Sequence, residues 1–258
     1  MNADQFKTHM AQLPRPETDL QPPYWQAWRL NLYDWILDND PAQFGFCPAV
    51  YHCMLVNHWT GPIEYELNQL LNSRLVEACT LPHFGPQDTF LYGQLSMNLI
   101  HQAYHIHQWE RATGRRIDQL DTIVEFGGGY GAMALLVHRL GFEGKYIIYD
   151  LPEFSLLQEY YLSQFGLLAN VTWPKGGERK PKNVDLFMGL YSISEVPLKD
   201  RPQAMVKANS YLFLYSGLWE GWNNVEWFKQ FAMSTTLEWQ HSELVHLPDK
   251  NNWYSIGW

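Results

Sequence analysis

The sequence predicts an α/β fold, a Rossmann-like parallel sheet that follows a mostly helical amino-terminal region. From residue 119 onward, short apolar runs alternate with helix-like runs, which is typical of a parallel sheet with helices on both faces. One junction between such runs, residues 127–131, packs four glycines into five positions. Near the end, two strand-like runs are separated only by "PDKNN", which is too short for a parallel crossover and predicts an antiparallel hairpin.

The first 118 residues carry apolar side chains at helical spacing. We expect helices within the stretches 22–40, 62–80 and 87–114. Pro62 lies near the start of the second stretch, where proline is common in the first turn of a helix. Gly114 ends the third stretch and suits a helix C-cap. We therefore interpret residues 1–118 as a helical cap or substrate region and residues 119–258 as a Rossmann-like domain.

The second half contains seven strand-like runs with helix-like runs between them. The expected strands are 122–126, 145–150, 170–174, 184–192, 210–217, 237–247 and 252–258. The expected helices are 131–141, 151–166, 198–209 and 223–234. The last two strands form the hairpin that closes the sheet.

Composition restricts the class of partner. The formal net charge of −9 argues against a duplex nucleic-acid binder, which needs a basic face, and favours small-molecule chemistry. Aromatic residues make up 16%, a content that suits either a large core or the grip on a flat ligand such as a sugar ring. The sequence starts without an apolar leader, and no apolar run approaches the ~20 residues of a membrane span. We expect a cytoplasmic protein, with no membrane or nucleic-acid partner, that could form a homo-oligomer.

The glycine-rich stretch predicts a nucleotide site. Gly127, Gly129 and Ala132 fit the G-x-G-x-x-G/A pattern, in which a strand turns into a helix and bare backbone approaches a ligand. Asp150 follows about 20 positions later, where an acidic residue binds ribose hydroxyls. The pattern is equally compatible with nicotinamide dinucleotides, flavin dinucleotides and S-adenosylmethionine.

A nearby charge favours one of these ligands. Glu125 lies on the strand two residues before Gly127. An anionic pyrophosphate is disfavoured beside a carboxylate, whereas the methionine end of S-adenosylmethionine carries an ammonium and a sulfonium. The sequence therefore favours the methyl donor.

The run "IVEFGGGYGAMALLVHRLGFEGKYIIYDLPEFSLLQEYYL" resembles the S-adenosylmethionine-dependent O-methyltransferases, above all the sugar O-methyltransferase family. That family combines an E-x-G-G-G-Y-G element with a strand ending in D-L-P-E and a Gln-containing helix. The resemblance is specific over residues 119 to about 165 and looser over 183–258. It implies that 119–258 is an S-adenosylmethionine-binding methyltransferase domain with the seven-stranded class I sheet and its antiparallel final pair.

The resemblance also assigns residues to the donor. It places Asp150 at the ribose hydroxyls and Leu151 beside the adenosine. The residues it places at the methionine moiety and the turn beneath it are Glu125, Gly127, Gly128, Gly129 and Tyr130. The implied activity is methyl transfer to a hydroxyl of a sugar or sugar-bearing small molecule. The alternatives are a phenolic or carboxylate acceptor, an NAD-dependent oxidoreductase, and a non-catalytic S-adenosylmethionine-binding subunit.

The proton of an acceptor hydroxyl needs a base, which should stand at the carboxyl ends of the strands. Glu195 is the only ionisable group of the turn "YSISEVP" after the fourth strand, and it is our first candidate. Its alternative role is a carboxylate that stabilises a helix N-terminus. Plant O-methyltransferases carry a histidine in roughly this turn, and this chain has none there. His105 is our second candidate, four residues after His101 on one helix face.

The sequence assigns no metal site. Two histidines at positions i and i+4 without an H-E-x-x-H pattern are a weak zinc signal. A divalent metal could be held by carboxylates such as Asp185, Glu195 and Glu220, but no spacing demands it.

Overall fold

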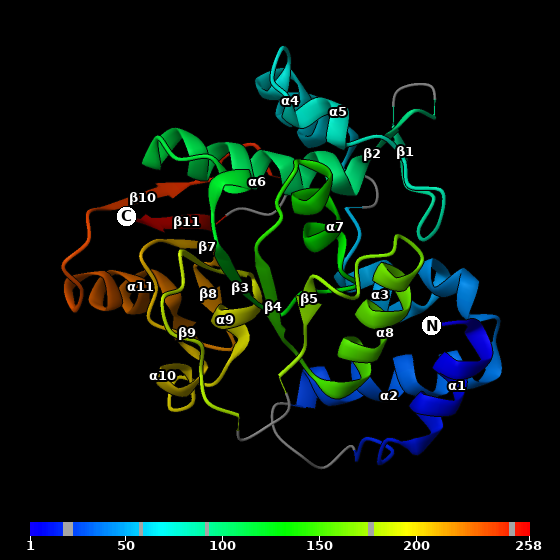
Figure 1. Ribbon diagram of the computed structural model, residues 1–258. Coiled ribbons are helices and arrows are strands. Elements are labelled where there is room, and N and C mark those ends of the chain that lie inside the picture. The colour runs from blue at the N-terminus through cyan, green and yellow to red at the C-terminus, as the bar shows by residue number, and fades with distance from the viewer. Residues whose placement is uncertain (18–22, 57–58, 91–92, 175–177, 248–250) are drawn as a thin grey trace.

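The computed structural model describes residues 1–258 except 18–22, 57–58, 91–92, 175–177 and 248–250. Its centre is a seven-stranded sheet with the order β10-β11-β7-β6-β3-β4-β5 (Figure 1). The strands of this sheet are β3 (Thr122–Phe126), β4 (Lys145–Tyr149), β5 (Val171–Thr172), β6 (Leu186–Leu190), β7 (Tyr211–Ser216), β10 (Trp239–Glu243) and β11 (Asn252–Gly257).

The direction of the strands confirms the predicted fold class. Strands β3 to β7 pair in parallel, whereas β11 is antiparallel to both of its neighbours, β7 and β10. This is the expected Rossmann-like sheet of seven strands, closed by a C-terminal antiparallel hairpin. The turn expected at 248–252 lies largely outside the described residues.

Helices flank the sheet. In the second half, their bounds are α7 (Ala132–Arg139), α8 (Pro152–Ser163), α9 (Ser192–Glu195), α10 (Arg201–Ala204) and α11 (Asn224–Met233). The helix expected over 198–209 is therefore reduced to the four residues of α10. A short hairpin that the periodicity did not predict joins β8 (Leu218–Trp219) to β9 (Trp222–Asn223) before α11.

The first half is mostly helical, as predicted. It contains α1 (Ala3–Gln12), α2 (Pro23–Asp38), a 3-10 helix (Pro41–Phe46), α3 (Pro48–Cys53), α4 (Thr60–Leu70), α5 (Leu75–Ala78) and α6 (Met97–Thr113). The single helix expected over 62–80 is wrong, because the chain breaks between α4 and α5, where Asn72 adopts a left-handed φ of 66°. Asparagine tolerates that conformation better than most residues, so it ends the helix.

The third expected helix starts later than predicted. A hairpin of β1 (Thr89–Phe90) and β2 (Leu95–Ser96) precedes α6. The Ser96 hydroxyl caps α6 by accepting from the Leu99 amide, and buried Asp88 accepts from the Ser96 hydroxyl and the Asn98 amide. Gly114 ends the helix in the left-handed conformation, as expected.

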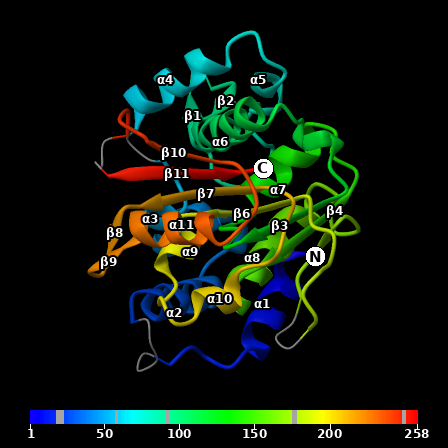
Figure 2. The same cartoon turned by 90° about the vertical axis from the view of Figure 1, so that its left-hand side faces the viewer.

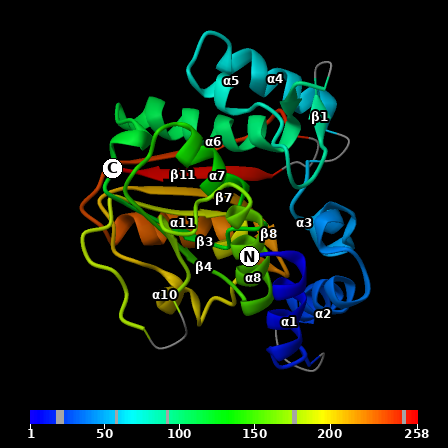
Figure 3. The same ribbon diagram turned by 45° about the vertical axis from the view of Figure 1, so that its right-hand side comes forward.

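The early helices pack directly on the sheet domain. Helices α1 and α2 contact α8, and Phe6 stacks on Tyr160 with ring centroids 4.6 Å apart (Figures 1 and 3). Helix α6 contacts α7 and β11, while α11 lies on the opposite face of β11 (Figure 2). Buried apolar side chains of both halves form one continuous cluster. The division of the chain near residue 118 stays a prediction.

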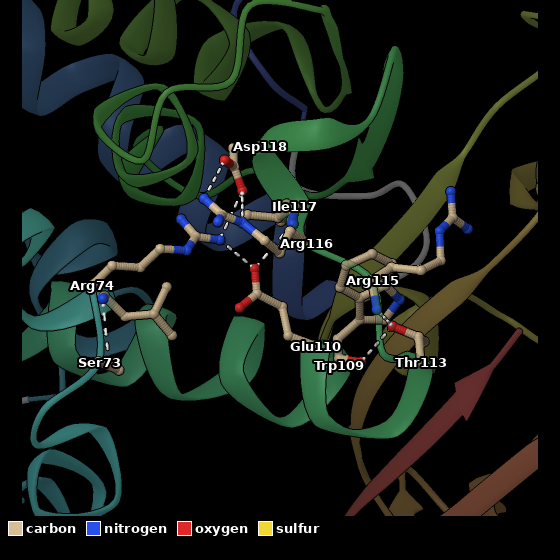
Figure 4. Close-up of polar contacts among 10 residues, drawn as sticks. Ser73, Arg74, Trp109, Glu110, Thr113, Arg115, Arg116, Ile117 and Asp118 are labelled. Atoms are coloured by element: carbon tan, nitrogen blue, oxygen red, sulfur yellow. Dashed lines mark hydrogen bonds and ion pairs between the residues drawn. The ribbon is translucent and has the colours of Figure 1, made fainter.

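Charged side chains join the end of α6 to the start of the sheet domain (Figure 4). Arg74 lies 2.5 Å from Glu110 and 2.8 Å from Asp118, and Glu110 accepts from the Ile117 amide at 2.9 Å. Arg116 pairs with Asp118 at 2.7 Å. This network fixes α6 relative to the segment that enters β3. Within the described part of the chain, no helix has the length and apolar character that crossing a bilayer requires.

Candidate functional site

A cavity of about 760 Å³ opens at the carboxyl ends of the central strands. Its walls come from the glycine turn after β3, the end of β4, the turn after β6, and helices α2 and α6. Every residue that the sequence analysis assigned to the donor or to the base lines this cavity, namely Glu125, Gly127, Gly128, Gly129, Tyr130, Asp150, Leu151, His105 and Glu195. The volume lies within the range of small-molecule sites, about 300–1,000 Å³.

Gly127 and Gly129 of this turn are glycines for two different reasons. Gly127 has a φ of 73°, and a Cβ there would lie 2.4 Å from the Cβ of Ser192, so close packing against the turn after β6 requires a glycine. Gly129 also has a positive φ, 57°, but a Cβ there would meet nothing nearer than Met54 at 3.7 Å. Bare backbone at Gly129 therefore faces open cavity, as a cradle for a ligand would.

Glu125 lies buried on β3 behind the glycine turn. Its Oε2 accepts a hydrogen bond of 2.8 Å from the Tyr146 hydroxyl. Burial raises the pKa of Glu125 to about 8; the Tyr146 hydrogen bond opposes the increase, and the charge of Asp150 adds to it. Without a ligand, Glu125 is thus mostly protonated near neutral pH, whereas the sequence prediction treated it as a carboxylate. A cation beside it would favour its ionised form.

Asp150 follows β4 and is held from both sides. Its Oδ1 accepts from the Leu151 amide and its Oδ2 from Gln158 Nε2, both at 2.7 Å. Burial raises its pKa to about 7, against the effect of these two hydrogen bonds and of the Gly128 backbone amide, while the charge of Glu153 adds to the increase. A carboxylate offers about four lone-pair sites, so capacity remains to accept from ribose hydroxyls.

Gln158 on α8 ties the parts of this region together. It is fully buried, its amide nitrogen also donates to the Gly129 carbonyl at 2.9 Å, and its oxygen accepts from Trp173 at 2.9 Å. The family resemblance includes a glutamine in this helix but assigns no role to it. Gln158 could have been recognised from the run D-L-P-E-F-S-L-L-Q, because a helix that begins at Pro152 returns position 158 to the side of Asp150.

Tyr130 belongs to the floor of the turn. Its ring packs edge-on against Tyr161, 5.1 Å between centroids, and it is buried in the core. Its hydroxyl accepts a 2.9 Å hydrogen bond from Asn98 Nδ2 on α6. Tyr130 therefore connects the glycine turn to α6.

Glu195 ends α9, directly after the turn that follows β6. Its Oε2 accepts a 2.8 Å hydrogen bond from the indole of Trp25 on α2. Burial raises the pKa of Glu195 to about 7; the Trp25 bond lowers it, and the charge of Glu220 raises it further. A pKa near neutral suits a group that must take up and release a proton.

The backbone that carries Glu195 is held by a buried arginine. Arg201 donates to the carbonyls of Ser194 and Val196, which flank Glu195, at 2.6 and 2.8 Å, and to Asn224 Oδ1 at 2.7 Å. Before this turn, Tyr191 has a φ of 65°, a conformation that side chains rarely adopt. Strained backbone of this kind persists only where its surroundings enforce it, and it often occurs at functional sites.

His105 lies in a different environment. Its Nδ1 is hydrogen-bonded to the Tyr254 hydroxyl, and burial, then the charges of His101 and His246, lower its pKa well below the ordinary value. The buried carboxylate of Glu66 lies 2.9 Å from both His101 and His246, and these partners lower its pKa although burial alone would raise it. This His101, Glu66 and His246 cluster anchors α6 on α4 and is absent from the sequence prediction, because its members are far apart in the chain.

The proposed carboxylate set for a metal does not assemble. Asp185 accepts from the amides of Asp121 and Thr122 at the amino end of β3, away from Glu195. Across the described residues, no three His, Cys, Asp or Glu side chains come together as metal ligands would.

No protein-family model and no curated protein matches the sequence. Solved structures resemble the chain only distantly. An O-methyltransferase family protein from Burkholderia thailandensis is 12% identical over 61% of this chain and 58% of that chain, with a TM-score of 0.44. This chain thus spans less than two thirds of the length of that protein.

Two further similar structures have the same low level of likeness. A precorrin-6y C5,15-methyltransferase from Geobacter metallireducens is 12% identical over 63% of this chain and 88% of that chain, with a TM-score of 0.44. A SAM-dependent methyltransferase from Aquifex aeolicus is 17% identical over 53% of this chain and 80% of that chain, with a TM-score of 0.38. Likeness at this level carries no information on activity or substrate.

Proposed function

We propose that the protein is an S-adenosylmethionine-dependent O-methyltransferase that acts on a hydroxyl of a sugar or sugar-bearing small molecule. The observation that carries this proposal is the shared cavity. The glycine turn, Glu125 and Asp150 occupy its β3–β4 side, and Glu195 stands after β6 on another wall. One cavity thus offers groups that suit a nucleoside with a cationic tail. On another wall it offers Glu195, a carboxyl group with a pKa of about 7.

The residues present fit the donor. Asp150 keeps capacity to accept from ribose hydroxyls, the open side of Gly129 admits a ligand, and Glu125 would ionise when a cation approaches. S-Adenosylmethionine, when bound, supplies an electrophilic methyl group on a sulfonium. The protein aligns the acceptor hydroxyl and excludes water, which account for a large part of the rate in such displacements.

Glu195 would accept the proton of the acceptor hydroxyl at its carboxylate. An aliphatic hydroxyl does not ionise unaided near neutral pH, so a positioned base contributes about 10²–10⁴ in rate. The Trp25 indole holds one oxygen of Glu195 and leaves the other for the substrate. Trp25, Trp59 and Phe154 also line the cavity and offer apolar faces to a sugar ring.

Binding and product formation test the proposal separately. S-Adenosylhomocysteine should raise the melting temperature in differential scanning fluorimetry, whereas NAD should not. Incubation with S-adenosylmethionine and a panel of sugars, nucleotide sugars, phenols and carboxylates should give a methylated sugar by mass spectrometry. Stabilisation by NAD alone contradicts the donor assignment, and methylation of phenols or carboxylates alone contradicts the acceptor class.

A further inference from the structure

We propose that the cavity face of α6, through the side-chain oxygens of Asn98 and Gln102, binds the α-ammonium group of the donor. This inference rests on the proposed function and assigns residues that the sequence analysis did not. It starts from two buried polar atoms that have no partner among the described residues.

Asn98 is 1% exposed and lines the cavity, and its Oδ1 is buried without a hydrogen-bond partner among the described residues. Gln102 lies one helical turn further along α6, also lines the cavity, and its Oε1 is likewise buried without a described partner. Buried polar atoms are nearly always hydrogen-bonded in folded proteins, so two exceptions on one helix face beside a cavity require an explanation. A ligand that donates hydrogen bonds provides one.

The surrounding contacts fix where the Asn98 oxygen lies. The Asn98 amide nitrogen is committed to the Tyr130 hydroxyl, so the oxygen is the part of this side chain left for a ligand. Tyr130 sits between Gly129 and Gly131, so Asn98 stands beside the glycine turn. The helix is anchored at Asp88 and by the 2.9 Å contact of Glu66 with His101. The Asn98 oxygen is therefore held in place before any ligand arrives.

The chemistry of the site selects an ammonium. A side-chain amide oxygen only accepts hydrogen bonds, and an ammonium offers three donors. Glu125, across the glycine turn, ionises more readily when a cation is near. In the proposed function the ribose hydroxyls belong to Asp150 and the adenosine, with its amino group, lies beside Leu151 after β4, so the ammonium at the other end of the molecule is the donor group that this wall would meet.

Two ligands that differ only in the amino-acid end test the inference. S-Adenosylhomocysteine carries that end, and 5′-methylthioadenosine lacks it while keeping the adenosine and sulfur. Isothermal titration calorimetry of the full chain should show that Asn98→Leu and Gln102→Leu each weaken S-adenosylhomocysteine about tenfold or more, because hydrogen bonds to a charged group are lost. Affinity for 5′-methylthioadenosine should change by no more than about twofold.

Gln108→Leu, the same substitution at a position of α6 that does not line the cavity, serves as the matched control and should leave both affinities unchanged. Should Asn98→Leu fail to fold, Gln102→Leu at its half-buried position still decides the question. Equal losses for both ligands, or unchanged binding of S-adenosylhomocysteine, overturn the inference while the proposed function stands. A parent protein that binds neither ligand overturns both.

Discussion

At the residue scale, Asp150 shows how a carboxylate can be fixed and still remain available. Its two protein hydrogen bonds set its orientation and leave lone pairs for the ribose. We expect Asp150→Asn to weaken S-adenosylhomocysteine about tenfold or more, because an amide offers fewer and weaker acceptor sites. Calorimetry measures the change, and the control is Asp121→Asn, an exposed position at the amino end of β3. An unchanged dissociation constant in a folded variant would falsify the ribose assignment.

Glu195 is the second prediction at this scale. Its pKa of about 7 means that its basic form predominates above that pH, so the rate should rise through pH 7 and then level off. Glu195→Gln keeps the shape, and we expect it to lower kcat about 100-fold or more, to remove this pH dependence and to leave donor affinity unchanged. Glu243, exposed on β10, provides the control, as Glu243→Gln.

His105 is the competing candidate for the base. Burial keeps its imidazole neutral near pH 7, and Tyr254 holds its Nδ1. We expect His105→Gln to retain turnover within a few-fold of the parent in steady-state assays. A large loss for His105→Gln with full activity of Glu195→Gln would reverse the order of the two candidates.

At the scale of elements, the turn after β6 depends on α10 and α11. Arg201 is fully buried between the indoles of Trp222 and Trp227, and it bonds the carbonyls on both sides of Glu195. Arg201→Lys keeps the charge but cannot reach both carbonyls in one plane. We expect kcat to fall roughly ten- to hundredfold, because Glu195 is misplaced, while donor affinity is unchanged.

The control for Arg201→Lys is Arg116→Lys, an exposed position in the segment between α6 and β3 (Figure 4). Circular dichroism and melting temperature show whether the fold is retained. A general structural role would reduce donor affinity and kcat together, and that outcome contradicts a specific role in placing Glu195.

At the scale of the whole molecule, the cavity concentrates carboxyl groups whose pKa values burial has raised. The pKa of Glu125 is raised to about 8, and those of Asp150 and Glu195 to about 7. A group whose pKa is higher in the folded state binds more protons there, so its contribution to stability falls as pH rises between the unfolded and folded values. Buried histidines such as His105 act in the opposite direction, but only up to about pH 6.5, their unfolded value.

Because the stability contributed by these carboxyl groups falls as they ionise, we predict that the melting temperature of the ligand-free protein falls between pH 7 and pH 8. Glu125→Gln, which can still accept from Tyr146, should flatten most of that slope, whereas Glu143→Gln at an exposed position should not. Differential scanning calorimetry across the interval provides the measurement. A stability that rises with pH over this window contradicts the protonated state assigned to Glu125.

The sequence by itself determined the sheet, the hairpin, the glycine turn and the acidic residues beside it. These features depend on local periodicity and on glycine backbone geometry, both of which act within a few residues. Apolar spacing predicted one helix through Asn72 and another that begins before Ser96. Both predictions were wrong, because the left-handed backbone at Asn72 and the hairpin and cap before α6 override apolar spacing.

Only the tertiary structure decided which distant side chains complete the site. Trp25 reaches Glu195 across 170 positions of the chain, and Asn98 reaches Tyr130 across 32. The pKa values of Glu125 and Glu195 likewise depend on burial, which is a property of the packed molecule. Helix periodicity shows that α2 and α6 have apolar faces, but which polar groups those faces turn toward the cavity depends on how the helices dock on the sheet.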